Sequence, residues 1–134
     1  MPSAKRHYRL TVADALSAHD RALRFGGGLS GILNLGLVES AITRPYAGYY
    51  RNMPRKLAAL IESMSTNHGF VDGNKRTTLI LATVLLSKSG YGLSPKRGDG
   101  GHKAALERLI LSVAQRERSF DELVCWISNR LVRL

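Results

Sequence analysis

Apolar residues recur every three to four positions along most of this chain, a spacing that predicts helices with one apolar face each. The strict alternation typical of strands is confined, at most, to Tyr8 to Leu10 and to the segment Pro45 to Asn52. The pattern therefore predicts an almost entirely helical, all-α fold. The expected helices run from Thr11 to Gly26, Leu35 to Thr43, Pro54 to His68, Asn74 to Ser89, His102 to Gln115 and Asp121 to Leu131.

Local signals mark several of these helix ends. Thr11 with Asp14, and Ser119 with Glu122, have the spacing of capping boxes, in which each partner bonds a free backbone N–H of the first turn. Gly90 is the expected end of the helix that begins at Asn74. These boundaries depend on neighbouring residues only, so the sequence alone predicts them.

The helix expected from Asn74 is too apolar to lie on the surface, and we expect it to be the central buried helix. The residues behind this expectation are Leu79, Ile80, Leu81, Val84, Leu85 and Leu86.

The segment Pro45 to Asn52 places tyrosines on both sides of Gly48. This arrangement predicts a small exposed β-hairpin or flap, which could cover a site.

Composition and charge give expectations for the number of domains, the partners and the location of the protein. With 134 residues and 44% hydrophobic content, the chain can build one compact core, so a single domain over residues 1–134 is expected. A formal charge of +10 favours an anionic partner: a nucleotide, a nucleic acid or an acidic protein. The lone Cys125 lies in an apolar pattern, which predicts a buried structural thiol and a cytoplasmic location. No apolar run or leader predicts a membrane association.

The segment from Asn67 to Thr78 gathers the residues that suggest chemistry. Gly73 and Asn74 precede the expected core helix, whose first backbone N–H groups can bind an anion. Gly73 has no side chain to block a phosphate, and Lys75 and Arg76 add positive charge. The segment therefore predicts a phosphate site.

Two further residues of this segment extend the prediction. Asp72 would repel a phosphate unless its carboxylate holds Mg²⁺, which bridges phosphate oxygens. The imidazole of a histidine can exchange a proton under physiological conditions, so His68 can accept a proton from an attacking hydroxyl. Phe70 is the expected buried anchor of the loop. Taken singly, each residue also fits a structural role, a histidine at a helix end as a cap and Lys75 with Arg76 as a solvated pair.

The run His68-x-Phe70-x-Asp72-x-Asn74-Lys75-Arg76 resembles the motif of the Fic/Doc superfamily, specifically its death-on-curing (Doc) branch of toxins. The resemblance extends over about residues 8 to 131. It implies a compact helical fold that binds ATP and magnesium beside a flap. The stretch Tyr46 to Tyr50 lies where the family has this flap in its sequence. It further implies that His68 activates the target hydroxyl, that Asp72 holds the metal, and that Gly73, Asn74, Lys75 and Arg76 cradle the phosphates.

Two positions bear on the group transferred. Fic enzymes that transfer AMP have a glycine where this chain has Lys75 and an arginine where it has Leu79, and at both positions the chain is similar to Doc. The resemblance thus implies a protein kinase that transfers the γ-phosphate of ATP to translation elongation factor Tu and stops translation. Gly73 stands where the Doc prototype has alanine, so AMP transfer remains the alternative.

Partners and other activities follow from the same comparison. Relatives carry an inhibitory Ser/Thr-x-x-x-Glu-Gly/Asn helix, and none of the five glutamates here completes it, so a separate antitoxin protein is expected. An acidic, disordered antitoxin segment could fold onto the basic surface. A non-enzymatic nucleic-acid-binding module, suggested by charge alone, and an inactive relative are the remaining readings.

Overall fold

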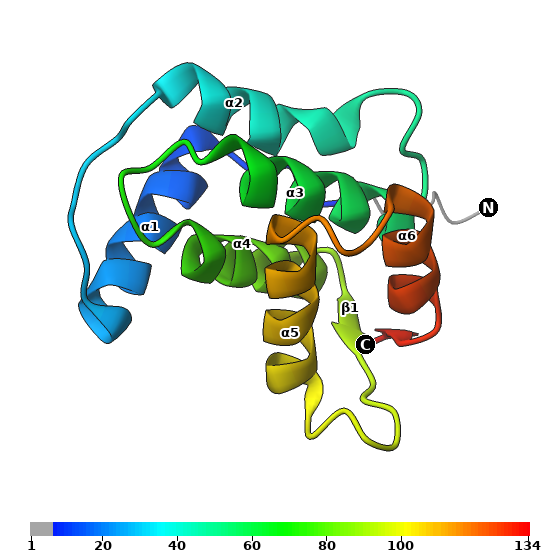
Figure 1. Ribbon diagram of the computed structural model, residues 1–134. Helices are drawn as coiled ribbons and strands as arrows, with labels where there is room; N and C mark the ends of the chain where they lie inside the picture. The colour runs from blue at the N-terminus through cyan, green and yellow to red at the C-terminus, as the bar shows by residue number, and fades with distance from the viewer. Residues whose placement is uncertain (1–6) are drawn as a thin grey trace.

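The computed structural model describes residues 7–134 and has a mainly helical architecture, as predicted (Figure 1). Two short strands form a small antiparallel pair beside the helices. The elements are α1 (Val12–Gly26), α2 (Leu35–Thr43), the 3-10 helix η1 (Arg44–Tyr46), α3 (Met53–Asn67), α4 (Asn74–Lys88), β1 (Tyr91–Leu93), α5 (His102–Ala114), α6 (Phe120–Ser128) and β2 (Leu131–Arg133).

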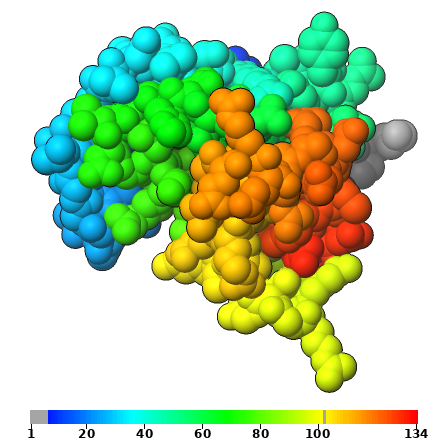
Figure 2. All heavy atoms as spheres, viewed as in Figure 1, coloured from blue at the N-terminus to red at the C-terminus, as the bar shows by residue number. Residues whose placement is uncertain are grey.

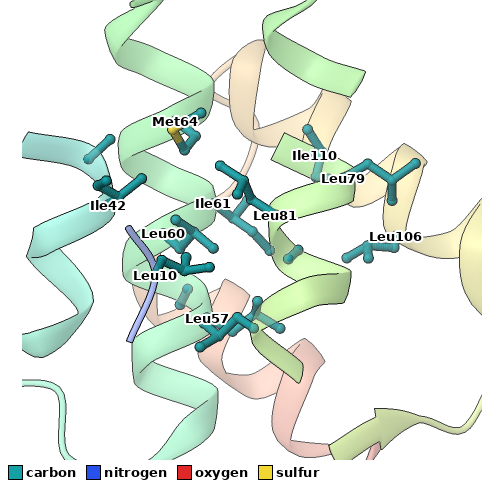
Figure 3. Packing of buried hydrophobic residues seen from close by; sticks show 14 of the residues in the cluster. Leu10, Ile42, Leu57, Leu60, Ile61, Met64, Leu79, Leu81, Leu106 and Ile110 are labelled. Carbon is teal, nitrogen blue, oxygen red and sulfur yellow. The ribbon is translucent and has the colours of Figure 1, made fainter. Parts of the chain in front are cut away.

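Helix α3 shares the centre of the molecule with α4. It packs against α2, α4, α5 and α6, and its buried residues lie on most of its circumference (Figure 1). We expected α4 to be the central helix, and α4 is indeed largely buried, but α3 is buried still more completely. The small residues Ala58 and Ala59 on α3 let its neighbours approach closely. Figure 3 shows part of the apolar cluster around these helices, including Leu10, Ile42, Leu57, Leu60, Ile61, Met64, Leu79, Leu81, Leu106 and Ile110.

The predicted caps are present. Thr11 and Asp14 form a complete capping box on α1, and Ser119 and Glu122 form one on α6. Gly90 follows α4 with φ 83°, a left-handed conformation that favours glycine and ends the helix.

Helix α6 ends at Ser128, before the predicted Leu131. The last residues instead form β2, which pairs antiparallel with β1 in the register Tyr91↔Arg133, Gly92↔Val132 and Leu93↔Leu131. Strands of three residues are too short to give an alternating pattern, so sequence periodicity could not reveal them.

The prediction of a β-hairpin at Pro45 to Asn52 is wrong. This segment forms η1 and a turn, not a hairpin, and Tyr8 to Leu10 is not a strand. The Tyr46 hydroxyl accepts from Leu10 N at 2.7 Å and donates to Tyr8 O at 2.6 Å, so this tyrosine ties the two segments together. The segment precedes α3, whose 15 residues separate it from His68.

The prediction for Cys125 is also wrong, since its thiol is exposed. Helix α6 turns Leu123 and Ile127 toward the core, and a residue midway between them lies on the opposite face. Phe120 and Trp126 pack against the core as expected. Over the described residues, no helix is both long and apolar enough to cross a bilayer.

Candidate active site

His68 lies where α3 ends and the motif loop, residues 68–73, begins. Its backbone is left-handed, with φ 49° and ψ 57°, and its side chain is exposed. The ring Nε2 lies 3.0 Å from the carbonyl oxygen of Ser65. A carbonyl only accepts, so Nε2 carries the proton and Nδ1 keeps a free lone pair. The local fold therefore selects the tautomer in which Nδ1 can act as a base.

Asn74 holds the motif loop in shape from the first turn of α4. Its Oδ1 accepts from Phe70 N at 3.1 Å, and its Nδ2 donates to Phe70 O at 2.9 Å. Both polar atoms of the amide are therefore committed to one backbone unit. Asn74 is one of the residues predicted to cradle phosphates, and its backbone N–H at the start of α4 is the group positioned for that role.

Phe70 is the buried anchor that the sequence predicted, with only 1% of its surface exposed. Its ring stacks on that of the buried His19 from α1, with centroids 3.9 Å apart and planes 8° apart. His19 Nε2 also donates to the carbonyl oxygen of Asp72 at 2.8 Å. Helix α1 thus fixes the loop at two points, through a ring and through a backbone carbonyl.

The linker between α1 and α2 runs antiparallel to the motif loop. Ile32 and Phe70 form an isolated bridge, Val71 N donates to Gly31 O at 3.1 Å, and Gly69 O accepts from the backbone N–H groups of Leu33 and Asn34. Sequence reasoning did not predict this pairing. The segment that lies beside the motif loop is therefore this linker, and not the tyrosine-rich segment.

Asp72 presents an exposed carboxylate that backbone groups hold in place. Its Oδ2 accepts from Leu29 N at 3.2 Å and its Oδ1 from Gly73 N at 2.8 Å. These hydrogen bonds, first that from Leu29 and then that from Gly73, lower the pKa of Asp72, so the group is ionised at neutral pH. Within residues 7–134, no Lys or Arg lies within ion-pair distance of it.

The donor set around Asp72 fits Mg²⁺ held together with phosphates. A single carboxylate is a common protein contribution to magnesium that is completed by substrate phosphates and water. The described residues contain no group of three or more His, Cys, Asp or Glu that could hold a metal without such a substrate. The site thus suits a metal that arrives with a phosphorylated ligand.

One cavity of about 500 Å³ brings all the predicted site residues together. In the space-filling view, the green surface near the motif loop lies between the blue and cyan surface of the N-terminal elements and the gold surface of α5 (Figure 2). The lining residues are His68, Val71, Asp72, Gly73, Asn74, Lys75, Arg76, Leu79, Glu107, Ile110 and Leu111.

The N-terminus of α4 forms one wall of this cavity. Gly73 adopts φ 75° and caps the helix without a side-chain bond, and the intrahelical ladder begins with Thr77 N donating to Gly73 O at 2.9 Å. The backbone N–H groups of the first turn can therefore bind an anion. Lys75 and Arg76 are exposed beside them.

Helix α5 completes the cavity, and sequence reasoning did not assign it any part of the site. Glu107, Ile110 and Leu111 line the wall opposite the motif. Glu107 and Leu111 are four residues apart, about one helical turn, and this spacing in the sequence indicates that they share a face of the helix.

The model of the family described as Fic/DOC matches residues 9–86 of this chain. These residues include α1, α2, α3, the whole motif loop and all of α4 except its last two residues. The chain is also 40% identical over 113 residues to a protein named Toxin Doc from Mycolicibacterium smegmatis. That match covers 81% of this chain and 83% of the relative.

Proposed function

Since the chain belongs to the Fic/DOC family, we propose that it is a Doc-like toxin that transfers the γ-phosphate of ATP to a hydroxyl group of a protein. One observation carries this proposal: His68, Asp72 and the N-terminus of α4 line the same cavity. A base, a metal ligand and an anion cradle are the parts that phosphoryl transfer requires. The family resemblance favours elongation factor Tu as the target, and its phosphorylation would stop translation in the cytoplasm.

Each residue has a role in the proposed reaction. Nδ1 of His68 takes the proton as the target oxygen bonds to the γ-phosphorus, and the bond from that phosphorus to the bridging oxygen breaks to release ADP. The N–H groups of the α4 N-terminus, with Lys75 and Arg76, hold phosphate oxygens. Asp72 would hold magnesium, which neutralises phosphate charge and orients it.

The linker beside the motif supports a protein as the acceptor. Leu29 and Leu33 are 69% and 68% exposed, and Ile32 and Val71 are each 46% exposed. These side chains form an apolar rim next to the cavity. Exposed apolar surface of this kind marks contact with another macromolecule more often than contact with a small substrate.

Lys75 and Leu79 favour the γ-phosphate over AMP as the group transferred. Both line the cavity, Lys75 exposed and Leu79 with only 6% of its surface exposed. A lysine occupies space that glycine would leave for phosphates, and a buried leucine supplies no positive charge to a triphosphate. AMP transfer is the runner-up, because Gly73 leaves the cradle open.

Labelled ATP distinguishes the two reactions. The protein is incubated with purified elongation factor Tu and with a cell lysate, using ATP labelled at the γ- or at the α-position. We expect protein-bound label from the γ-position only, and a mass increase of one phosphate on the target. Label from the α-position alone would replace the kinase proposal with AMP transfer.

Two variants identify the site responsible. His68→Ala is expected to reduce transfer by about 10²- to 10⁴-fold, the usual contribution of a general base. Lys75→Gly combined with Leu79→Arg is expected to raise the share of label transferred from the α-position. If the His68→Ala protein kept full activity, the transfer would have to occur elsewhere.

A cavity of about 570 Å³ next to the motif cavity is the proposed docking site of an antitoxin. The two cavities share Arg76, Leu79 and Glu107. Phe25 is 83% exposed at this second cavity, and Arg21 and Lys103 also line it. An acidic segment with an apolar face would complement this surface. Phe25→Ala combined with Lys103→Glu is expected to weaken antitoxin binding in calorimetry by roughly 100-fold.

A further inference from the structure

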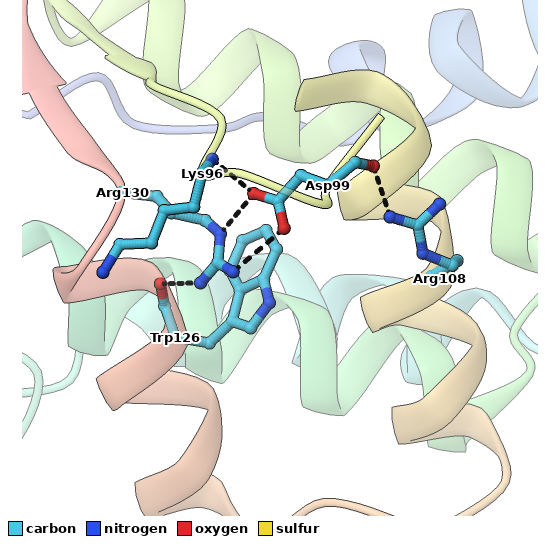
Figure 4. Close-up of polar contacts among 5 residues, drawn as sticks. All are labelled: Lys96, Asp99, Arg108, Trp126 and Arg130. Atoms are coloured by element: carbon cyan, nitrogen blue, oxygen red, sulfur yellow. Dashed lines mark hydrogen bonds and ion pairs between the residues drawn. The ribbon is translucent and has the colours of Figure 1, made fainter. Parts of the chain in front are cut away.

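A cluster of arginines lies on the far side of α5 from the motif cavity. Figure 4 shows two of them, Arg108 and Arg130, beside Asp99 and Trp126. Arg130, which follows α6, makes a two-pronged ion pair with Asp99: Nε lies 2.8 Å from Oδ2 and Nη2 lies 3.1 Å from Oδ1. The Arg130 guanidinium also lies 4.0 Å above the ring of Trp126 and donates to the Trp126 carbonyl at 3.2 Å. Arg130 is therefore fixed in position by contacts on three sides.

Two more arginines line the same cavity, and among residues 7–134 neither has a carboxylate within ion-pair distance. Arg108, on α5, donates to the backbone carbonyl of Asp99. Arg118, in the turn before α6, donates through Nε to Ser112 Oγ at 3.2 Å. Each guanidinium has five N–H donors, so each retains donors for a ligand.

The cavity has a volume of about 300 Å³, and its charge is positive. Arg108, Arg118 and Arg130 supply three positive charges against the single negative charge of Asp99. The oxygens of Asp99 are occupied by Arg130 and by the backbone N–H of Lys96, which donates at 2.7 Å. Among the residues that line the cavity, positive charges therefore outnumber negative charges by two.

This cluster is separate from the candidate active site. Glu107, Ile110 and Leu111 of α5 face the motif cavity, whereas Ala105, Arg108 and Leu109 line the cavity with the arginines. Within the described part of the chain, no residue lines both cavities, so the arginines are not part of the proposed transfer machinery.

We propose that this second cavity binds the phosphate group of a small anion, either free phosphate or a mononucleotide. Planar guanidinium groups match phosphate oxygens in a forked geometry. The arginines surround a small cavity and do not form a line along the surface, which fits a single phosphate group better than a nucleic-acid backbone.

Trp126 provides a direct test, because it lines this cavity and is the only tryptophan in the chain. Its fluorescence is followed while inorganic phosphate or AMP is added to the full-length protein. We expect a saturable change for at least one of them. If only phosphate acts, the ligand is free phosphate. If AMP acts at lower concentration, the ligand is a mononucleotide.

Variants assign the signal to the arginines. Arg118→Gln is expected to weaken binding at least about tenfold, since it removes charged hydrogen bonds. Arg118 is exposed, so the variant should fold, which circular dichroism verifies. Arg97→Gln is the matched control, because Arg97 is exposed in the neighbouring loop and does not line the cavity.

Three results would overturn the proposal. These are no saturable change by about 10 mM ligand, equal binding by wild type and Arg118→Gln, and a response to RNA alone. The transfer assay with labelled ATP reports on the motif cavity, so failure of either proposal leaves the other intact.

Discussion

Asp72 and Asp99 lie in two loops at opposite sides of α5, and both accept backbone hydrogen bonds, yet their surroundings differ in one respect. Asp99 is paired with Arg130, and its pKa is lowered to about 2, first by that side chain and then by Lys96 N–H. Asp72 has no such partner, and its pKa is lowered by the N–H groups of Leu29 and Gly73. An arginine neutralises a carboxylate, whereas backbone N–H groups orient it and leave its charge available.

The difference separates a structural carboxylate from one suited to binding. Asp99 is 9% exposed and joins the loop after β1 to the C-terminal end of the chain. Asp72 is exposed in a cavity that also contains His68 and the N-terminus of α4. A cation such as magnesium can therefore reach Asp72, while Arg130 already occupies the equivalent place at Asp99.

Exchanging each aspartate for asparagine tests this comparison most strongly. Asp72→Asn is expected to reduce transfer from ATP by about 100-fold or more, because it removes the only charged metal ligand proposed for the site. Its melting temperature should stay close to that of the wild type, since the group is exposed. Initial rates at several magnesium concentrations provide the measurement, and full activity at low magnesium would contradict the assignment.

Gly28→Ala moves the Asp72 carboxylate without removing it. Gly28 has φ 115°, and a Cβ there would lie 2.7 Å from Asp72 Oδ2. We expect the displaced carboxylate to require about tenfold more magnesium for half-maximal transfer. Gly98→Ala is a control of similar strain, because Gly98 has φ 92° and open space around it. A similar magnesium requirement in both variants would show that strain, and not the position of Asp72, is responsible.

Asp99→Asn is expected to act on stability. Asp99 has its pKa lowered from 3.8 to about 2, so its pairing stabilises the fold fully above about pH 4, and this contribution is lost as the pH falls toward 2. The variant should therefore melt a few degrees below the wild type near pH 6. Thermal denaturation at decreasing pH should show the two curves approaching each other. A difference that stays constant down to about pH 2 would exclude the ion pair as its source.

Much of the fold follows from local sequence signals. The capping residues Thr11 and Ser119 fix their helix starts through bonds to residues three positions away, so the sequence contained the whole interaction. The exposure of Cys125 was missed because several faces of the short helix α6 carry apolar residues, and only tertiary packing selects among them.

The candidate site likewise has parts that the sequence predicted and parts that it did not. The spacing from His68 to Arg76 predicted residues that the fold brings into one cavity, since they are close in sequence. The clamp of Asn74 on Phe70, the pairing of Ile32 with Phe70 and the wall formed by Glu107 were not predicted. The first depends on one rotamer, and the other two join segments that only the folded chain brings together.

Gly26→Ala extends the comparison from the aspartates to two arginines, with the smallest expected effect. Arg130 is fixed by Asp99 and Trp126, whereas Arg76 makes only a 3.4 Å hydrogen bond to Ala22 O and lies against Gly26. A Cβ at Gly26 would overlap the Arg76 guanidinium, whose flexible stem can turn it away. Alanine is favoured over glycine within a helix by up to about 1 kcal/mol, so stability should change by no more than that.

The affinity for ATP tests whether the Arg76 guanidinium contacts phosphate from a mobile or from a fixed position. If its free donors contact phosphate from a mobile position, Gly26→Ala should change the dissociation constant of ATP by less than about threefold, because the guanidinium can return to the phosphate. Arg76→Gln, which removes the charge, should weaken binding at least about tenfold. Calorimetric titration of both variants measures the two effects. Equal losses would mean that Arg76 acts only from its place beside Gly26, which would make it a fixed group like Arg130.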